Sequence, residues 1–242
     1  MREISAAQML EIWDRGRGVR GPVHRTLELL RLAEGLQPAD AATLPIGLRD
    51  GHLLRVFEEL FGPELAALVT CAACGAELEV RVPVKGLKTE APGDPGAWTR
   101  VEHEDTAVEF RLPNSLDLLA VAHVDSGAPR WTRLLERVVR RDSGEQHPGM
   151  AMSDDLILEV ERRMADLDPQ AEIQLELQCD ACRATFCKVL DIGAFLWTEL
   201  DGWARRTLHE VHLLARAYGW SERAILQLRP QRRLLYLEML SQ

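Results

Sequence analysis

The residues best suited to chemistry are four cysteines arranged as two pairs. Each pair has the spacing C-x-x-C, at Cys71 and Cys74 and again at Cys179 and Cys182. The two thiolates of such a pair can reach one ion across a tight turn, and two pairs together supply the four ligands of a tetrahedral structural zinc site. The doubled motif therefore predicts that both pairs bind one Zn²⁺, although residues 75 to 178 separate them.

Two other interpretations of the cysteine pairs stay open. Each C-x-x-C could be a turn of small buried residues that binds no metal, or one pair could be a thioredoxin-like redox dithiol. A redox pair should open a helix, where the helix dipole lowers the pKa of the thiol, and neither pair precedes a helical pattern. In a zinc site four cysteines leave no position for water, so the metal would be structural rather than catalytic.

Two further positions near the second pair differ from the simplest zinc pattern. Gly75 follows the first pair, whereas Arg183 stands at the matching place after the second. Because glycine eases a left-handed turn, we expect the second turn to be more strained or differently shaped. Cys187, the fifth cysteine, is expected to be a small buried residue rather than a ligand.

Alternating patterns on both sides of each pair predict the strands that position the cysteines. Leu78, Val80 and Val82 alternate with charged residues after the first pair, and an apolar run, 65 to 69, precedes it. The second pair follows the same alternation at Ile173, and a further strand is expected over 185 to 190. The sequence predicts strand, tight turn and strand twice, and we expect the flanking strands to form one small antiparallel sheet with zinc at its tip.

The remaining patterns predict an α+β protein that is mainly helical. We expect an N-terminal helical region (1–63), a zinc-ribbon-like sheet (64–191) with a helical insertion (about 113–168), and a C-terminal helical region (192–242). Residues 86–105, which are rich in Gly, Pro and charge, and 142–149 are expected to be loops. The sequence also predicts a short strand at 108–112 and helices at 47–60, 131–140, 153–167 and 192–218.

Composition favours a folded globular protein. The chain has 242 residues and 27.2 kDa, of which 46% are hydrophobic and 28% charged. Its net charge of −9 disfavours a general role in coating nucleic acid. No apolar run approaches the length of a membrane span, and the N-terminus lacks the layout of a signal peptide. We therefore expect synthesis in the cytoplasm, where disulfides are disfavoured.

No motif for catalysis was found, so the chain is predicted not to be an enzyme. The segment His209-Glu210-Val211-His212 differs by one residue from the zinc-protease spacing and is interpreted as an ordinary helix surface. Arginines concentrate in the C-terminal third, which indicates either a docking face or a helix surface with local ion pairs. The aromatic residues of the same region suit either an interface or a core; they are Trp197, Trp203, Trp220 and Tyr236.

Several segments, taken in order, resemble one protein family. They are C-A-A-C-G at 71–75, V-E-F-R-L-P-N-S-L-D-L-L at 108–119, A-E-I-Q-L-E-L-Q-C-D-A-C at 171–182, and the ending from His212 to Leu240. The most specific part is Y-G-W-S-E, from Tyr218 to Glu222, followed by R-R-x-x-Y-L, from Arg232 to Leu237. Over about residues 40 to 242 the chain resembles the phage baseplate-like proteins of contractile tails and extracellular contractile injection systems.

This resemblance implies a structural adaptor rather than an enzyme. It would link the spike, tube and sheath-side proteins of a phage-tail-like particle, be present in several copies, and join the particle after synthesis in the cytoplasm. Arg232, Arg233 and the corner from Tyr218 to Ser221 match the signature positions of the family, with roles in packing or at an interface. Neither a membrane nor nucleic acid is an expected partner.

Two alternatives to the adaptor remain. The chain could be an assembly chaperone that acts before the baseplate is complete, or a zinc-ribbon regulator that binds nucleic acid. The regulator requires a basic surface near the cysteines, but acids such as Glu77, Glu79 and Asp180 flank both pairs. The local charge therefore disfavours it.

Overall fold

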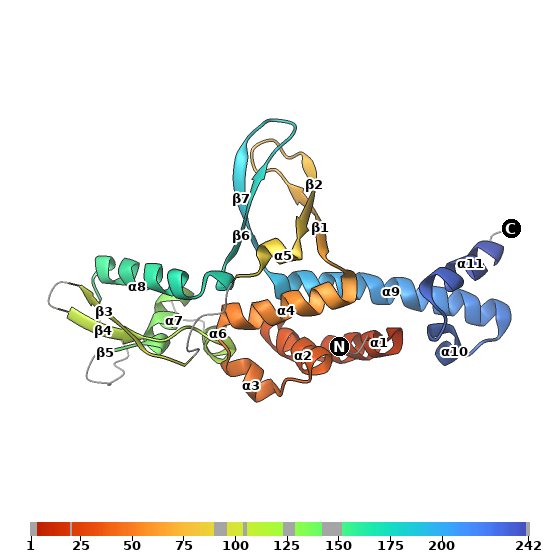
Figure 1. Cartoon of the computed structure of the whole chain (residues 1–242), viewed down its shortest axis with the longest axis horizontal. Helices are drawn as coiled ribbons and strands as arrows, with labels where there is room; N and C mark the ends of the chain where they lie inside the picture. The colour runs from red at the N-terminus through yellow and green to blue at the C-terminus, as the bar shows by residue number, and fades with distance from the viewer. Residues whose placement is uncertain are drawn as a thin grey trace.

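The computed structural model describes residues 4–19, 21–89, 96–103, 106–122, 129–141 and 152–240. The fold is α+β and mainly helical, as the sequence predicts. A helical body carries three projections (Figure 1): two β-hairpins on one side, an insertion at one end of the long axis, and a C-terminal lobe at the other. Within the described residues, no helix combines the length and apolar character that crossing a bilayer requires.

The helical body contains the largest core. It is formed by α1 (Ala6–Gly18), α2 (Pro22–Glu34), α3 (Pro38–Thr43), α4 (Ile46–Phe61), α5 (Val84–Leu87) and the first half of α9 (Ile192–Tyr218). Leu30, Leu53 and Leu196 are fully buried where α2, α4 and α9 meet. This core also includes Leu65 and Ile173 from the strands, so it draws on all three regions expected from sequence. The division into those three domains stays a prediction.

The strands beside the cysteines form two separate hairpins. Strand β1 (Glu64–Thr70) pairs with β2 (Glu77–Pro83), and β6 (Ile173–Gln178) pairs with β7 (Thr185–Leu190). The expectation of a single sheet is therefore wrong. Each C-x-x-C turn joins two strands that pair only with one another, and the hairpins rise side by side from the body (Figure 1).

The insertion has its own sheet and core. Three antiparallel strands, in the order β3–β4–β5, pack with α6 (Ser115–Ala122), α7 (Arg130–Val138) and α8 (Asp154–Leu167); the strands are β3 (Thr99–His103), β4 (Thr106–Phe110) and β5 (Val139–Arg141). The expected loop at 86–105 thus contains β3, and the helix expected to reach Arg140 ends at Val138. Strand β3 pairs with one edge of β4 and β5 pairs with the other, and Val108 and Phe110 of β4 are fully buried. The loop expected at 142–149 lies outside the described residues.

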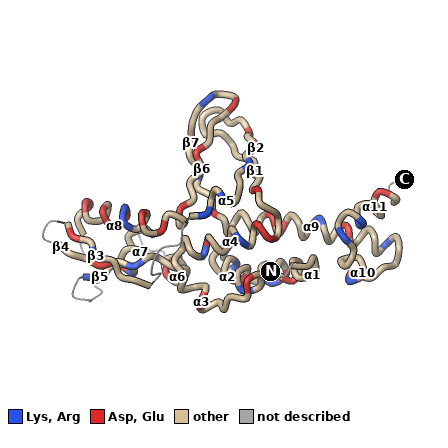
Figure 2. Tube along the Cα trace, in the orientation of Figure 1, with Lys and Arg blue, Asp and Glu red and all other residues tan. Residues whose placement is uncertain are grey.

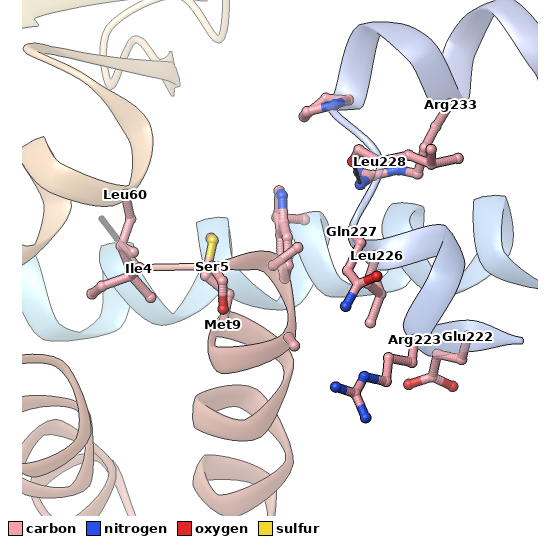
Figure 3. Close-up of a pocket in the computed structure, with 14 residues that line it drawn as sticks. Ile4, Ser5, Met9, Leu60, Glu222, Arg223, Leu226, Gln227, Leu228 and Arg233 are labelled. Atoms are coloured by element: carbon pink, nitrogen blue, oxygen red, sulfur yellow. Dashed lines mark hydrogen bonds between the residues drawn. The ribbon is translucent and has the colours of Figure 1, made fainter. Parts of the chain in front are cut away.

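The C-terminal lobe packs around the end of α9. Gly219, in the left-handed region at φ 67°, ends α9 and turns the chain into α10 (Glu222–Leu226) and α11 (Pro230–Leu240). Between the lobe and the body lies a cleft of about 810 Å³. In Figure 3 the side chains of Ile4 and Leu60 line its body side, and those of Leu226 and Arg233 line its lobe side.

Candidate metal centre

The four cysteines meet where the tips of the two hairpins come together. The Sγ atoms of Cys71 and Cys182 are 3.8 Å apart, those of Cys74 and Cys179 are 3.7 Å apart, and all four lie within 4.8 Å of one another. Four sulfurs placed about 2.3 Å from a central ion at tetrahedral corners would be about 3.8 Å apart. A disulfide would require about 2.05 Å. The four cysteines could therefore bind a metal ion.

The same backbone turn presents both pairs. In the first hairpin the Cys71 N–H donates to Ala76 O at 2.9 Å, and the Gly75 N–H donates to Cys71 O at 2.9 Å. In the second, the equivalent bonds run from Cys179 N–H to Ala184 O at 2.9 Å and from Arg183 N–H to Cys179 O at 2.8 Å. Two segments that are distant in the sequence thus form the same type of turn. Each turn places its two sulfurs on the side that faces the other hairpin.

Position 183 carries the strain expected from sequence. The φ angle of Gly75 is 75° and that of Arg183 is 61°, so both residues occupy the left-handed region. Arg183 is the only residue other than glycine with a positive φ in the described part of the chain. A side chain makes this conformation costly by about 1 to 2 kcal/mol. The expected strain is confirmed, while the turn keeps the hydrogen bonds of its glycine-containing counterpart.

The surrounding groups affect the two thiols of the first pair differently. Backbone N–H groups of Cys74 and Ala73 lower the pKa of Cys71 to about 7. For Cys74, the Ala76 N–H favours the thiolate, but hydrogen bonds with Cys182 and Cys179 outweigh it and raise the pKa to about 12. Binding of a metal by the pair would require both thiols to lose their protons.

The cysteine cluster is half-buried. Cys71 and Cys179, the first cysteines of their pairs, are buried, whereas Cys74 and Cys182 are exposed. An ion held by all four would lie at the surface of the hairpin tips. Throughout the described ranges no other group of three or more His, Cys, Asp or Glu side chains is close enough to hold an ion. The segment His209–His212 forms no such group.

The expectation that Cys187 is buried is wrong. Its side chain is exposed, and the residue pairs with Glu176 across the second hairpin. Neighbouring residues in a strand point to opposite faces, and Phe186 takes the more buried face, so Cys187 points outward. Cys187 is also outside the cluster of four, in agreement with the prediction that it is not a ligand.

A buried polar joint at the base of the hairpins sets their positions, and sequence reasoning missed it. The joint lies in η1 (Pro169–Ala171) and the residue before it. Asp168 Oδ2 accepts from the Gly47 N–H at 2.9 Å, which ties this segment to α4. The Gln170 side chain donates to Leu87 O at 2.9 Å and accepts from the Thr89 N–H at 2.8 Å. These bonds bring the start of β6 beside the segment that follows β2.

The joint leaves no room for a side chain at the start of α4. A Cβ atom added to Gly47 would collide with the Asp168 carboxylate and would lie 2.7 Å from the backbone nitrogen of Ala171. Burial raises the pKa of Asp168, despite the hydrogen bond from Gly47. In the sequence only Gly47 could have indicated this joint, and a single glycine does not identify a close contact because glycine also occurs in turns and at helix ends.

Comparison with known proteins gives no neighbour from which a function could be carried over. The likeness to baseplate proteins, which rests on the segments quoted above, stays an expectation from sequence. Searches against models of protein families, curated proteins and solved structures find no match to this chain.

Proposed function

We propose that the cysteine cluster binds one Zn²⁺ and that this ion fastens the two hairpins together. The support is the separation of the sulfur atoms, 3.7 and 3.8 Å, which agrees with a tetrahedral tetrathiolate site. Zinc suits this donor set because thiolate ligands and tetrahedral geometry satisfy its preferences, although iron also occupies such sites. Metal analysis of the purified chain distinguishes the two.

The proposed ion has a structural role. Four thiolates complete its coordination and leave no place for a substrate or an activated water. When metal binding requires the folded arrangement, its binding free energy adds to the free energy of folding. The ion would therefore stiffen a projection whose two hairpins each have only two strands, and isolated two-stranded hairpins are marginally stable.

We further propose that the protein is a baseplate adaptor of a phage-tail-like contractile particle, in contact with its spike, tube or sheath-side proteins. One observation carries this proposal: the residues of the resembling segment build the C-terminal lobe. Tyr218 stacks on Trp220 with ring centroids 4.8 Å apart, and Tyr236 packs edge-on against Trp220 at 4.9 Å. Tyr236, 16 residues beyond Trp220 in the sequence, thus joins Tyr218 and Trp220 in one aromatic cluster.

A partly buried ion pair adds to the same lobe. Arg233 Nε donates to Glu210 at 2.8 Å, and its Nη1 donates to Leu228 O at 3.2 Å. Arg233 is buried, while its neighbour Arg232 is exposed. Within the signature pair, the first arginine is therefore available to a partner and the second holds α11 against α9.

The shape of the molecule also suits an adaptor. An adaptor must contact several neighbours at once, and the body carries projections in three directions (Figure 1). Each projection has its own stabilising feature: the cysteine cluster in the hairpins, a separate core in the insertion, and the aromatic cluster in the lobe. Each surface can then be presented without support from the other two.

Isolation of the particle from cells that produce the chain tests this function. A tagged chain should co-sediment with sheath and tube proteins and should remain with the baseplate fraction after the sheath has been removed. Binding only to incomplete subassemblies would indicate the assembly chaperone instead. Retention of DNA that decreases with salt would indicate the nucleic-acid regulator, and either result would overturn the adaptor.

A further inference from the structure

Large exposed apolar side chains concentrate at the two ends of the long axis. The described part of the chain has eleven, and nine of them lie in the insertion or the C-terminal lobe. Those in the insertion are Leu116, Trp131, Leu158 and Leu167, and those in the lobe are Tyr218, Leu234, Leu235, Met239 and Leu240. Apolar surface gathered in this way indicates interaction sites. Figure 1 places the two groups at opposite ends of the molecule.

Part of the apolar surface of the insertion is a groove, whose lining includes Trp131 and Leu158 but neither Leu116 nor Leu167. It has a volume of about 1010 Å³ and lies among α6, α7, α8 and the start of β6. Apolar residues dominate its lining, among them Trp131, which is 37% exposed, and Leu158, which is 60% exposed. The acidic residues on its rim are Glu161 and Glu172, since the carboxylate of Asp168 is buried and bonded to the Gly47 N–H. Its one basic lining residue, Arg162, already pairs with Glu159 at 2.8 Å. The groove is therefore apolar with an acidic rim.

Three of the exposed apolar side chains of the lobe lie on one face of α11. Leu234, Leu235 and Met239 are 51%, 55% and 61% exposed, and the helix turns a different side, carrying Pro230 and Arg233, toward the cleft beside the body. Spacings of four and five residues place these three side chains on one half of the helix. No described element covers this face.

The charge around α11 is opposite to that of the groove. Seven arginines and five acids lie between residues 192 and 242, whereas the whole chain has a net charge of −9. Arg229, just before α11, and Arg232, in its first turn, are exposed and form no ion pair with any residue that the structure describes. Glu238 is the one acid on the helix. Figure 2 shows that both ends of the molecule carry basic and acidic positions.

We propose that α11 of one copy docks into the groove of a second copy, so that the chain associates head to tail. Leu234, Leu235 and Met239 would fill the apolar groove, and Arg229 and Arg232 would meet its acidic rim. Because the two surfaces differ and lie at opposite ends, each copy can bind one neighbour through each end. Such a heterologous contact produces a ring if it closes and a filament if it does not.

This inference does not depend on the assignment to a contractile particle, since it concerns the isolated chain. It also differs from a symmetric dimer in which two α11 helices pair with one another. A symmetric dimer would use the lobe alone and leave the groove free. The groove and the helix can therefore be tested separately.

Two single variants, each with one damaged end, provide the test. Leu235→Glu places an acid on the docking helix, and Leu158→Glu places one in the groove. Both side chains are exposed, so the fold should be retained, which circular dichroism and metal content would check. Val189→Glu is the control, because Val189 is 63% exposed on a hairpin and lies outside both surfaces. Sedimentation velocity of the full chain over a range of concentrations measures association.

The expected pattern is specific to head-to-tail contact. The unmodified chain and Val189→Glu should form larger species as concentration rises, and each of the other two variants should remain monomeric alone. An equimolar mixture of Leu235→Glu and Leu158→Glu should form a dimer and nothing larger. The intact α11 of Leu158→Glu can bind the intact groove of Leu235→Glu, and the remaining helix and groove are both damaged. The proposal is overturned if the unmodified chain stays monomeric, if Leu158→Glu associates as well as the unmodified chain, or if the mixture does not pair.

Discussion

Substitutions at the left-handed position of the two cysteine turns should change stability in opposite directions. Arg183→Gly removes a conformational cost of about 1 to 2 kcal/mol but adds about 0.5 to 1 kcal/mol of chain entropy lost on folding. The net gain should be about 0.5 to 1 kcal/mol. Gly75→Ala should lose a similar amount, and a Cβ atom there would meet nothing within 4 Å, so the cost is conformational alone.

Unfolding in denaturant with the metal in excess measures these changes. A gain of 1 kcal/mol corresponds to an increase of about 2 to 4 °C in Tm for a chain of this size. Because the thiols converge only when the turn is formed, chelator competition should also show metal binding that is about two- to fivefold tighter for Arg183→Gly. The same assay should show weaker binding for Gly75→Ala.

Gly51→Ala is the matched control. Gly51 lies within α4, its φ is not positive, and an added Cβ atom would meet nothing within 4 Å. This substitution should therefore stabilise the protein by about 0.5 to 1 kcal/mol through helix propensity, without changing metal binding. If Arg183→Gly lowered stability, or if Gly75→Ala behaved like Gly51→Ala, the argument from backbone strain would be refuted.

Three further predictions concern the body and the insertion. Burial raises the pKa of Asp50 to about 6, despite Arg49, so the folded state binds this proton more tightly than the unfolded state. Unfolding free energy should therefore fall by up to about 3 kcal/mol between pH 4 and 6, relative to Asp50→Asn, when denaturation is followed against pH. Asp117→Ala should cost about 3 kcal/mol, because it leaves the Arg111 guanidinium, bound at 2.6 and 2.8 Å, without its carboxylate; hydrogen exchange should localise the loss to the insertion. Gly47→Ala should cost about 1 to 3 kcal/mol in a thermal melt, since the backbone of Ala171 blocks the added methyl group.

Local sequence patterns predicted the elements that present the cysteines. The alternation around Ile173 and Val80 gave the strands, and the doubled C-x-x-C placed the four thiols together. The glycine missing at 183 correctly indicated strain in the second turn. The strands and the turns depend on neighbouring residues, which is why the sequence alone reveals them, whereas the meeting of the two distant pairs was predicted from the repetition of the motif.

Contacts between distant residues explain what the sequence did not reveal. Strand β3 follows a segment rich in Gly and Pro and exists because it pairs with β4, as Val101 does with Val108. Cys187 is exposed because the register of its hairpin assigns the inner face to its neighbour. The bond between Gln170 and Leu87 joins residues 83 positions apart and has no periodic signature.

Metal content per chain tests the central claim most directly. The chain, purified without added metal and analysed by inductively coupled plasma mass spectrometry, should contain one zinc ion per molecule. Cys187→Ser should retain that ion, because Cys187 lies outside the cluster, and Cys74→Ser should lose most of it. Equal zinc in the Cys74→Ser variant and the unmodified chain, or no zinc in either, would contradict the proposed site.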